Sequence, residues 1–176
     1  MKLKPLKIED VPQFYTASII KGKFLLNSDR HKLILIESLQ YLVKENRVII
    51  YGYVIMDNHI HIVWKPTKLY SLQHTQLSFM KFTAQRLKRE LQNNNSIYLD
   101  DFYVEAKDRK YQFWKRNPLC VDLLNEKIIE QKLNYIHQNP VKAQICKNPQ
   151  DYRFSSARFY SELGDEFNIL TEFRNG

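Results

Sequence analysis

The stretch from residue 53 to residue 66 reads YVIMDNHIHIVWKP and decides the fold that we expect. Its β-branched and aromatic residues are typical of strands, and Asp57-Asn58 in its middle can turn the chain. Side chains two positions apart on a strand leave from the same face. His59 and His61 are therefore expected on one face, and the isoleucines beside them on the other. The pattern leaves open whether this stretch and the residues before it form one bent strand or a hairpin.

Outward from this stretch, strand-like and helix-like segments alternate. Apolar residues spaced three and four apart indicate helices. We expect strands at 14–20, 46–56, 59–64 and 100–107, and helices at 29–45, 71–91 and 126–137. The last helix should end at Asn139, because the residue before a proline is pushed out of helical geometry. The short connections predict an α+β fold, an antiparallel sheet with helices packed on it.

Length and composition indicate one globular domain that binds an anion. The chain has 176 residues, of which 44% are hydrophobic, so residues 1–176 are expected to form a single domain with a sizeable core. Its net charge of +8 and pI of about 9.4 favour nucleic acid first and an acidic membrane surface second.

The sequence also bears on location. No apolar stretch approaches the roughly 20 residues that span a bilayer, and the first ten residues have no signal-peptide core. Cys120 and Cys146 form no CxxC pair. We expect both to be reduced in a cytoplasmic protein, with a disulfide between them as the alternative.

The two histidines of the strand are candidate metal ligands. Neutral imidazoles bind first-row divalent metals well, and the His59–His61 spacing places two of them together. The alternative is one buried, hydrogen-bonded histidine and one solvated histidine. Two ligands do not hold an ion, so a third group is required, and the remaining histidines are candidates by composition: His31, His74 and His137.

A second pair lies near the end of the last expected helix. Positions i and i+4 of a helix are neighbours, so Tyr135 and Asn139 can be directed at one point. A tyrosine hydroxyl is a weak nucleophile at its free pKa of about 10, but a bound cation can activate it and polarise a phosphate. Together the two pairs would form a metal-assisted tyrosine nucleophile for cutting and rejoining DNA. The alternative is a packing tyrosine and a turn asparagine.

Two segments carry a resemblance to a known family. Residues 53–66 resemble the histidine–hydrophobe–histidine strand of the HUH single-tyrosine transposases. Residues 132–160, KLNYIHQNPVKAQICKNPQDYRFSSARFY, are similar to the C-terminal signature of that family, a YIHxNPVKA core followed by P-x-DY, SSA and a tyrosine. The likeness is closest to the REP-associated tyrosine transposases, relatives of the insertion-sequence-200-like enzymes, and covers roughly residues 14–160.

The resemblance implies roles for four residues. His59 and His61 match the two metal ligands, Tyr135 the nucleophile and Asn139 a third, polar ligand. It also implies a ferredoxin-like (RRM-like) fold with both histidines on a central antiparallel strand. Mg²⁺ or Mn²⁺ is the implied metal, and single-stranded DNA carrying a hairpin is the implied substrate. The chain would act as a monomer, as is usual in the REP-associated branch, or as a homodimer.

Three positions depart from the family's pattern. Asp57 stands where proline is common, and it is either a turn residue or a carboxylate beside a metal ligand. Gln144 replaces a common glycine. If that glycine has a positive φ, glutamine implies a changed local turn. Phe154 replaces the tryptophan before SSA.

Basic residues are expected to contact the DNA. Some lie on the 71–91 helix opposite its apolar stripe, and others surround the aromatic residues of the 107–116 segment. Cations that follow phosphates, with aromatic faces for bases, suit single-stranded nucleic acid. A solvated face with ordinary core aromatics is the alternative. The predicted DNA-binding residues are Lys81, Lys88, Arg89, Lys107, Arg109, Lys110, Lys115 and Arg116.

Three functions fit these observations. The favoured one is a metal-dependent single-stranded DNA strand transferase that cuts near hairpins through a 5′-phosphotyrosine intermediate, because all four site residues are intact. The second is a domesticated protein that binds hairpin DNA or RNA with weak or no cleavage. The third is a metal-dependent phosphodiesterase that uses water. A general base is not evident: Gln138 cannot serve, and His137 is a candidate.

Overall fold

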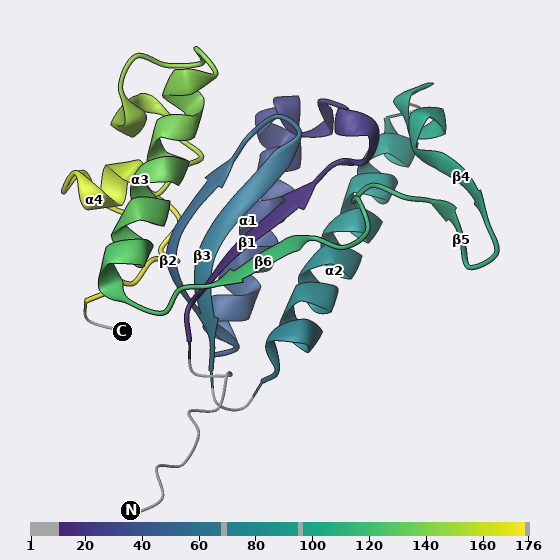
Figure 1. Ribbon diagram of the computed structural model, residues 1–176. Helices are drawn as coiled ribbons and strands as arrows, with labels where there is room; N and C mark the ends of the chain where they lie inside the picture. The colour runs from purple at the N-terminus through teal and green to yellow at the C-terminus, as the bar shows by residue number, and fades with distance from the viewer. Residues whose placement is uncertain (1–10, 68–69, 95–96, 175–176) are drawn as a thin grey trace, which may run out of the picture.

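A computed structural model describes residues 11–67, 70–94 and 97–174 (Figure 1). Six strands are β1 (Gln13–Ser18), β2 (Val48–Ile55), β3 (His59–Pro66), β4 (Tyr103–Ala106), β5 (Arg109–Tyr111) and β6 (Leu119–Asp122). Four α-helices are α1 (Asp29–Lys44), α2 (Leu72–Asn93), α3 (Glu126–Lys142) and α4 (Ala157–Tyr160). Short 3-10 turns are η2 (Ile20–Gly22), η3 (Leu25–Asn27), η4 (Ile97–Phe102) and η5 (Pro149–Asp151). Within the described ranges, no helix is long and apolar enough to cross a membrane.

The main sheet has the strand order β2-β3-β1-β6, and every neighbouring pair is antiparallel. The predicted α+β fold with an antiparallel sheet is confirmed, and the order is that of a ferredoxin-like sheet. β3 is a central strand, so its two histidines lie in the middle of the sheet. The question of a bent strand or a hairpin is also settled, because β2 and β3 pair across the turn at Asp57-Asn58.

Helices cover both faces of the sheet (Figure 1). α1 and α2 pack on the face that carries the even-numbered residues of β3, where Trp64 meets Phe79 edge-on at 6.2 Å between ring centroids. α3 packs on the opposite face, mainly against β2. Serine side chains cap the first two helices as expected for this residue type: Ser28 accepts from His31 N and Ser71 accepts from His74 N.

The C-terminal segment attaches itself to β2 through three hydroxyl groups. The Tyr152 and Tyr160 hydroxyls donate to backbone carbonyls of β2 at 2.6 and 2.7 Å. Ser156 Oγ accepts from the Tyr53 amide at 3.0 Å. These residues belong to the DY, SSA and final tyrosine of the 132–160 signature. This part of the signature therefore has a structural role, because it fixes the C-terminal segment along the outer strand.

Two expectations about element boundaries are wrong. α3 continues through Pro140 to Lys142 instead of ending at Asn139. Pro140 is buried, and its packing outweighs the local preference against helical geometry before proline. The strand expected at 100–107 begins later than expected: residues 100–102 belong to the turn η4, and the strand β4 covers 103–106.

At the end of α3, Gln144 has the positive φ that glycine would favour. Its φ is 59°, and its amide donates to Val141 O at 2.9 Å, while Ile145 N donates to Pro140 O at 2.9 Å. This pair of bonds is the Schellman arrangement, in which glycine is the usual residue at the left-handed position. The turn is therefore kept, and glutamine adopts it despite its Cβ.

α3 approaches β2 most closely at Gly52. A Cβ at this position would clash with Leu133 Cδ2 and lie 3.2 Å from Ile136 Cδ1 and 3.1 Å from Ser156 Oγ. Only a residue without a side chain lets the helix and the Ser156 segment lie this close to the strand. Gly52 thus sets the height of α3 above the sheet.

The first prediction concerns this contact. We expect Gly52→Ala to lower the free energy of unfolding by about 1–3 kcal/mol, because the methyl group overpacks the α3–β2 contact. Urea denaturation measures this change. The matched background is Leu133→Ala, which removes the clashing atoms. Gly52→Ala should cost clearly less there, and an equal cost in both backgrounds would contradict the assignment.

Candidate active site

The two histidines of β3 lie side by side on the face that α3 covers. Their ring centroids are 4.8 Å apart, with the planes at 70°. Thr16 of β1 is directly opposite His61 in the strand register, and its Oγ1 is 2.7 Å from His61 Nδ1. His59 Nδ1 is 2.6 Å from Asn58 Oδ1 and donates to it. Both Nδ1 atoms are thus engaged, and each ring keeps Nε2 for another partner.

Both imidazoles are held neutral by their surroundings. Burial lowers the pKa of His61 to about 3, and the nearby His59 and Lys132 contribute in the same direction. Burial also lowers the pKa of His59, while a hydrogen bond with the Asn139 side chain and the charge of Asp57 act in the opposite direction. Neutral imidazole is the form that binds a metal ion.

α3 brings Tyr135 and Asn139 to these rings. The Tyr135 ring lies 5.4 Å from that of His61, centroid to centroid, and meets it edge-on at 67°. Asn139 Nδ2 donates to Tyr135 O at 3.4 Å, and its side chain is hydrogen-bonded to His59. The two pairs that the sequence singled out therefore meet in space. Tyr135 is 43% exposed, so a substrate can reach it.

The site contains residues that the sequence reasoning missed. Lys132 and Lys142 of α3 each place Nζ 5.7 Å from the centre of the Tyr135 ring. Phe14 of β1 packs on both His61 and Tyr135, at 5.2 and 6.0 Å. The lysines are three residues before and seven after the tyrosine, a spacing on one helical face that could have revealed them. Phe14 and Thr16 follow only from the β1–β3 register.

The other three histidines lie elsewhere. His31 Nδ1 is bound to Leu25 O at 2.6 Å, and His74 is exposed in the first turn of α2. His137 is buried with Nε2 2.8 Å from Ser156 Oγ. It follows Tyr135 by two helical positions, about 200° around the helix axis. The structure thus brings none of the three to the His59–His61 pair, and His137 does not face the tyrosine as a general base would.

The donor set fits a divalent cation. Within the described ranges, no cluster of three or more His, Cys, Asp or Glu side chains could hold a metal. The candidate set differs from such a cluster, because it consists of two neutral imidazoles and the amide of Asn139. That amide donates through Nδ2 to Tyr135 O, and its hydrogen bond with His59 keeps it beside one of the two imidazoles. Such mixed nitrogen and oxygen ligands suit first-row cations and leave positions for phosphate oxygens.

Asp57 serves the hairpin turn. Its carboxylate accepts from Lys32 Nζ at 2.9 Å, and the Lys32 side chain is only 5% exposed. Its carbonyl accepts from Leu26 N at 2.8 Å. Of the two alternatives for Asp57, the structure favours the turn residue, here tied to α1 by a buried lysine. The carboxylate acts on His59 through its charge alone.

Six of the eight predicted DNA-binding cations line two adjoining hollows. The larger hollow, about 520 Å³ in volume, lies between α2 and the segment 108–116, and the second, of about 300 Å³, adjoins it along the same helix. The cations that line the two are Lys81, Lys88, Arg109, Lys110, Lys115 and Arg116. Arg89 and Lys107 do not line either.

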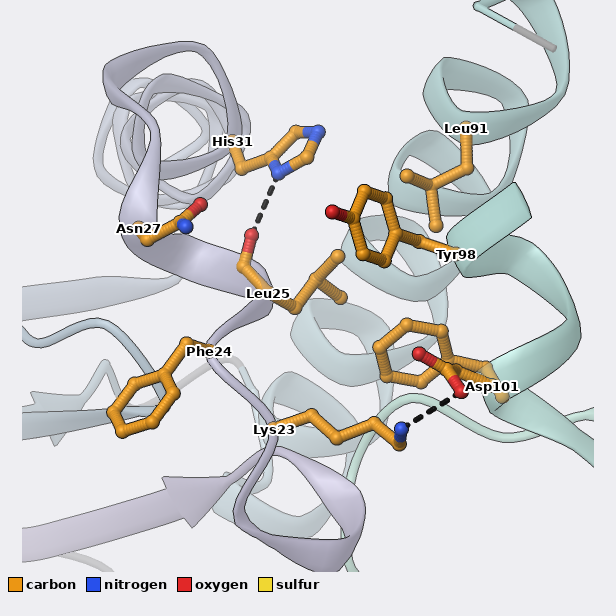
Figure 2. Close-up of a pocket in the computed structure, with 9 residues that line it drawn as sticks. Lys23, Phe24, Leu25, Asn27, His31, Leu91, Tyr98 and Asp101 are labelled. Atoms are coloured by element: carbon orange, nitrogen blue, oxygen red, sulfur yellow. Dashed lines mark hydrogen bonds and ion pairs between the residues drawn. The ribbon is translucent and has the colours of Figure 1, made fainter. Parts of the chain in front are cut away.

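A separate pocket of about 320 Å³ lies on the side of the sheet that α1 and α2 cover (Figure 2). It is lined by residues of the η3–α1 region, the end of α2 and η4. Figure 2 shows His31 bound to the Leu25 carbonyl and the ion pair of Lys23 with Asp101 at 2.9 Å in its wall. None of its lining residues belongs to the predicted active site.

Comparisons with known proteins agree with the fold. No protein-family model and no curated protein matches the chain. Among solved structures, a REP-associated tyrosine transposase bound to a REP hairpin matches all of this chain and 96% of that chain, with 17% identity and a TM-score of 0.64. A putative transposase from Deinococcus radiodurans R1 matches 78% of this chain and 97% of that chain, with 13% identity and a TM-score of 0.49. The first likeness shows that the chain shares the fold that the sequence resemblance implied.

The second prediction tests the structural role of His137. Burial lowers its pKa from 6.5 to about 4, so between these pH values the unfolded chain binds a proton that the folded chain does not. Stability should therefore fall as the pH drops from about 6.5 to 4. The gap of 6.5 − 4, about 2.5 pKa units, corresponds to on the order of 3 kcal/mol. In urea denaturation, His137→Gln should lose less stability than the wild type over this range. Parallel pH profiles would refute the role.

Proposed function

We propose that this chain is an HUH single-tyrosine transposase of the REP-associated type. It would be a DNA strand transferase, dependent on a divalent cation, that cuts single-stranded DNA near hairpins. The observation that carries the proposal is the meeting of Tyr135 with His61 at 5.4 Å while Asn139 is hydrogen-bonded to His59. The shared fold with a REP-associated tyrosine transposase bound to a REP hairpin supports the same class of substrate.

Three side chains would hold the cation. His59 and His61, oriented through Nδ1 by Asn58 and Thr16, would present Nε2, and Asn139 would present its amide oxygen. Mg²⁺ or Mn²⁺ is the expected ion. When bound, such an ion withdraws charge from a phosphate and stabilises a developing phenolate.

Tyr135 would perform the exchange. Its oxygen attacks the scissile phosphorus in line, the new bond to phosphorus forms, and the bond to the 3′ oxygen breaks. The phenolic proton passes to solvent, and the leaving 3′ oxygen takes up a proton. The product is a 5′-phosphotyrosine and a free 3′-hydroxyl. A second 3′-hydroxyl can attack the phosphotyrosine and join new ends, so one phosphoester replaces another and no nucleotide cofactor is required.

Nearby charge and chain connectivity support this reaction. Lys132 and Lys142 lie beside the Tyr135 ring, where their ammonium groups would attract a phosphate. All four site residues come from one chain, so exchange of the tyrosine helix between protomers is not required. We therefore propose that the active unit is a monomer.

The third prediction tests the nucleophile. Wild type, incubated with a hairpin oligonucleotide carrying a single-stranded extension and Mg²⁺, should form a covalent protein–DNA adduct on a denaturing gel. Tyr135→Phe should reduce the adduct by about a thousandfold or more, because the attacking oxygen is absent. Tyr41→Phe is the matched control, since Tyr41 is an exposed tyrosine of α1 and should behave as wild type.

The same gel separates the competing functions. Cleavage to a free 5′-phosphate without an adduct would indicate a phosphodiesterase that uses water. Binding without cleavage in any divalent cation would indicate a hairpin-binding protein. An adduct that persists in Tyr135→Phe would remove Tyr135 from the role.

The fourth prediction tests the cation ligands. EDTA should abolish adduct formation, and Mg²⁺ or Mn²⁺ should restore it in the wild type. His59→Ala and His61→Ala should each lose about a hundredfold or more in adduct formation, while binding of the hairpin in EDTA stays within about a factor of two. His74→Ala, an exposed histidine outside the site, is the control. Full activity of the wild type in EDTA would exclude a metal-assisted reaction.

A further inference from the structure

The turn between β2 and β3 is held by the connection between β1 and α1. Asn58 O accepts from Ile19 N at 2.8 Å, and Asp57 O accepts from Leu26 N at 2.8 Å. The Asp57 carboxylate accepts in addition from the buried Lys32 Nζ at 2.9 Å. Both residues of the turn are therefore fixed through their backbones, and the side chain of Asn58 leaves from a fixed position directly before the first histidine of β3.

The amide of Asn58 has two partners of different kinds. Its Nδ2 donates to Gly22 O at 3.3 Å, and its Oδ1 lies 2.6 Å from His59 Nδ1. A backbone carbonyl can only accept, so the amide nitrogen must face Gly22 and the amide oxygen must face His59. The reverse orientation would bring two oxygens together at Gly22. Since an amide oxygen also can only accept, the ring hydrogen of His59 is required on Nδ1.

Gly22 is suited to this role by its backbone conformation. Its φ is 66°, a left-handed conformation that glycine adopts at little cost. In this conformation its carbonyl is the acceptor that Asn58 Nδ2 meets. The orientation of the Asn58 amide therefore depends on a chain segment that contributes no side chain to the candidate site.

Thr16 imposes no such choice on the second histidine. Its Oγ1 lies 2.7 Å from His61 Nδ1. A hydroxyl group can donate as well as accept, so this hydrogen bond can form with either neutral tautomer of His61. The two histidines of β3 thus differ: the neighbour of His59 determines where its ring hydrogen lies, and the neighbour of His61 does not.

We propose that Asn58 is a positioning residue that fixes the tautomer of His59. Anchored on the Gly22 carbonyl, its amide oxygen keeps the ring hydrogen on Nδ1 and leaves the lone pair on Nε2. The proposal rests on the proposed function in one respect, the use of that lone pair for a divalent cation. It extends that function by naming the residue that determines which nitrogen of His59 can bind the ion.

A fixed tautomer has a direct consequence for cation binding. Neutral imidazole binds a metal ion through the nitrogen that carries no hydrogen. If the hydrogen of His59 were on Nε2, it would have to leave before an ion could bind there. With the hydrogen held on Nδ1 by Asn58, His59 needs no such rearrangement, so loss of the Asn58 amide should weaken cation binding without removing any ligand.

The first arm of the test determines the tautomer by NMR. Ring ¹⁵N shifts are measured by two-bond ¹H–¹⁵N correlation on labelled protein in EDTA, without DNA, at a pH above the unperturbed histidine pKa of about 6.5. His59→Ala identifies the His59 signals. Wild type should show Nδ1 protonated and Nε2 unprotonated. In Asn58→Leu, which has similar size and no polar atom, the form with the hydrogen on Nε2 should become the major one. Asn58→Asp keeps an acceptor and should keep Nδ1 protonated.

The second arm measures Mn²⁺ affinity without DNA, from the electron paramagnetic resonance signal of the free ion. Asn58→Leu should lower the affinity by about tenfold or more. The matched control is Asn93→Leu, which changes an exposed asparagine at the end of α2. This variant should keep Mn²⁺ affinity within about a factor of two and leave the His59 nitrogen shifts unchanged.

A wild-type His59 with its hydrogen on Nε2 would overturn the proposal without any variant. An Asn58→Leu protein with the wild-type tautomer or the wild-type Mn²⁺ affinity would overturn it as well. Absence of Mn²⁺ binding by the wild type would instead contradict the proposed function, and the nitrogen shifts would still decide the role of Asn58. Since neither arm involves DNA, the adduct assay with Tyr135→Phe remains an independent test of the nucleophile.

Discussion

The candidate site depends on the contact between α3 and the backbone of β2. Tyr135 lies on the exposed side of its helix, and nothing in that helix alone fixes its distance from the histidines of β3. Gly52 lets the helix lie directly on the strand, and Ser156 joins both layers, because its Oγ bonds the Tyr53 amide on one side and His137 on the other. The position of the tyrosine is therefore determined by close packing and buried hydrogen bonds beneath it.

This arrangement explains why the C-terminal signature extends so far beyond the tyrosine. The residues after α3 contribute no group to the site, yet their hydroxyls bind backbone atoms of β2. They cover the outer strand of the sheet and hold the helix against it. The 132–160 signature thus contains both residues of the candidate site and the residues that hold the C-terminal segment on β2.

Burial and the nearby positive charges have two effects at the site. Burial, the nearby His59 and the ammonium group of Lys132 disfavour a proton on His61, so the imidazole stays neutral. Lys132 and Lys142 also flank the tyrosine ring, where a phosphate would arrive. In the proposed reaction, the positive charge of these two lysines would attract the phosphate that Tyr135 attacks.

Local pattern was sufficient for some elements and insufficient for others. The 3.6-residue period found α1 nearly to the residue, and the alternation in HIH found the strand that carries the two neighbouring histidines. β6 was not predicted, because it is short and all its residues are exposed, so it has no alternation of buried and exposed residues for a sequence pattern to indicate. The end of α3 was misjudged because the buried packing of Pro140 is a tertiary effect, and a local rule on residues before proline does not contain it.

For the site, too, the local sequence pattern was sufficient for some features and tertiary structure was needed for others. Spacing along one element identified His59 with His61 and Tyr135 with Asn139, but it gave no distance between the pairs. Thr16 could not be found because its role comes from the β1–β3 register. Hydrophobicity also gave no means of telling which aromatics near Lys115 stack on DNA and which fill the core. Burial decides that question for Phe113 and Trp114, which fill the core.

The strand order of the sheet determines how the candidate site is held and how it is exposed. The ferredoxin-like order places β3 and β1 in the centre, so His59, His61 and Thr16 lie on strands that are paired on both sides and are held rigidly. The short edge strand β6 leaves part of the same face uncovered by α3, with Leu119 and Val121 exposed beside the site. A longer β6 covered by a helix would stabilise the sheet but would bury the surface beside Tyr135. The short, open edge therefore keeps the exposed part of the Tyr135 side chain accessible.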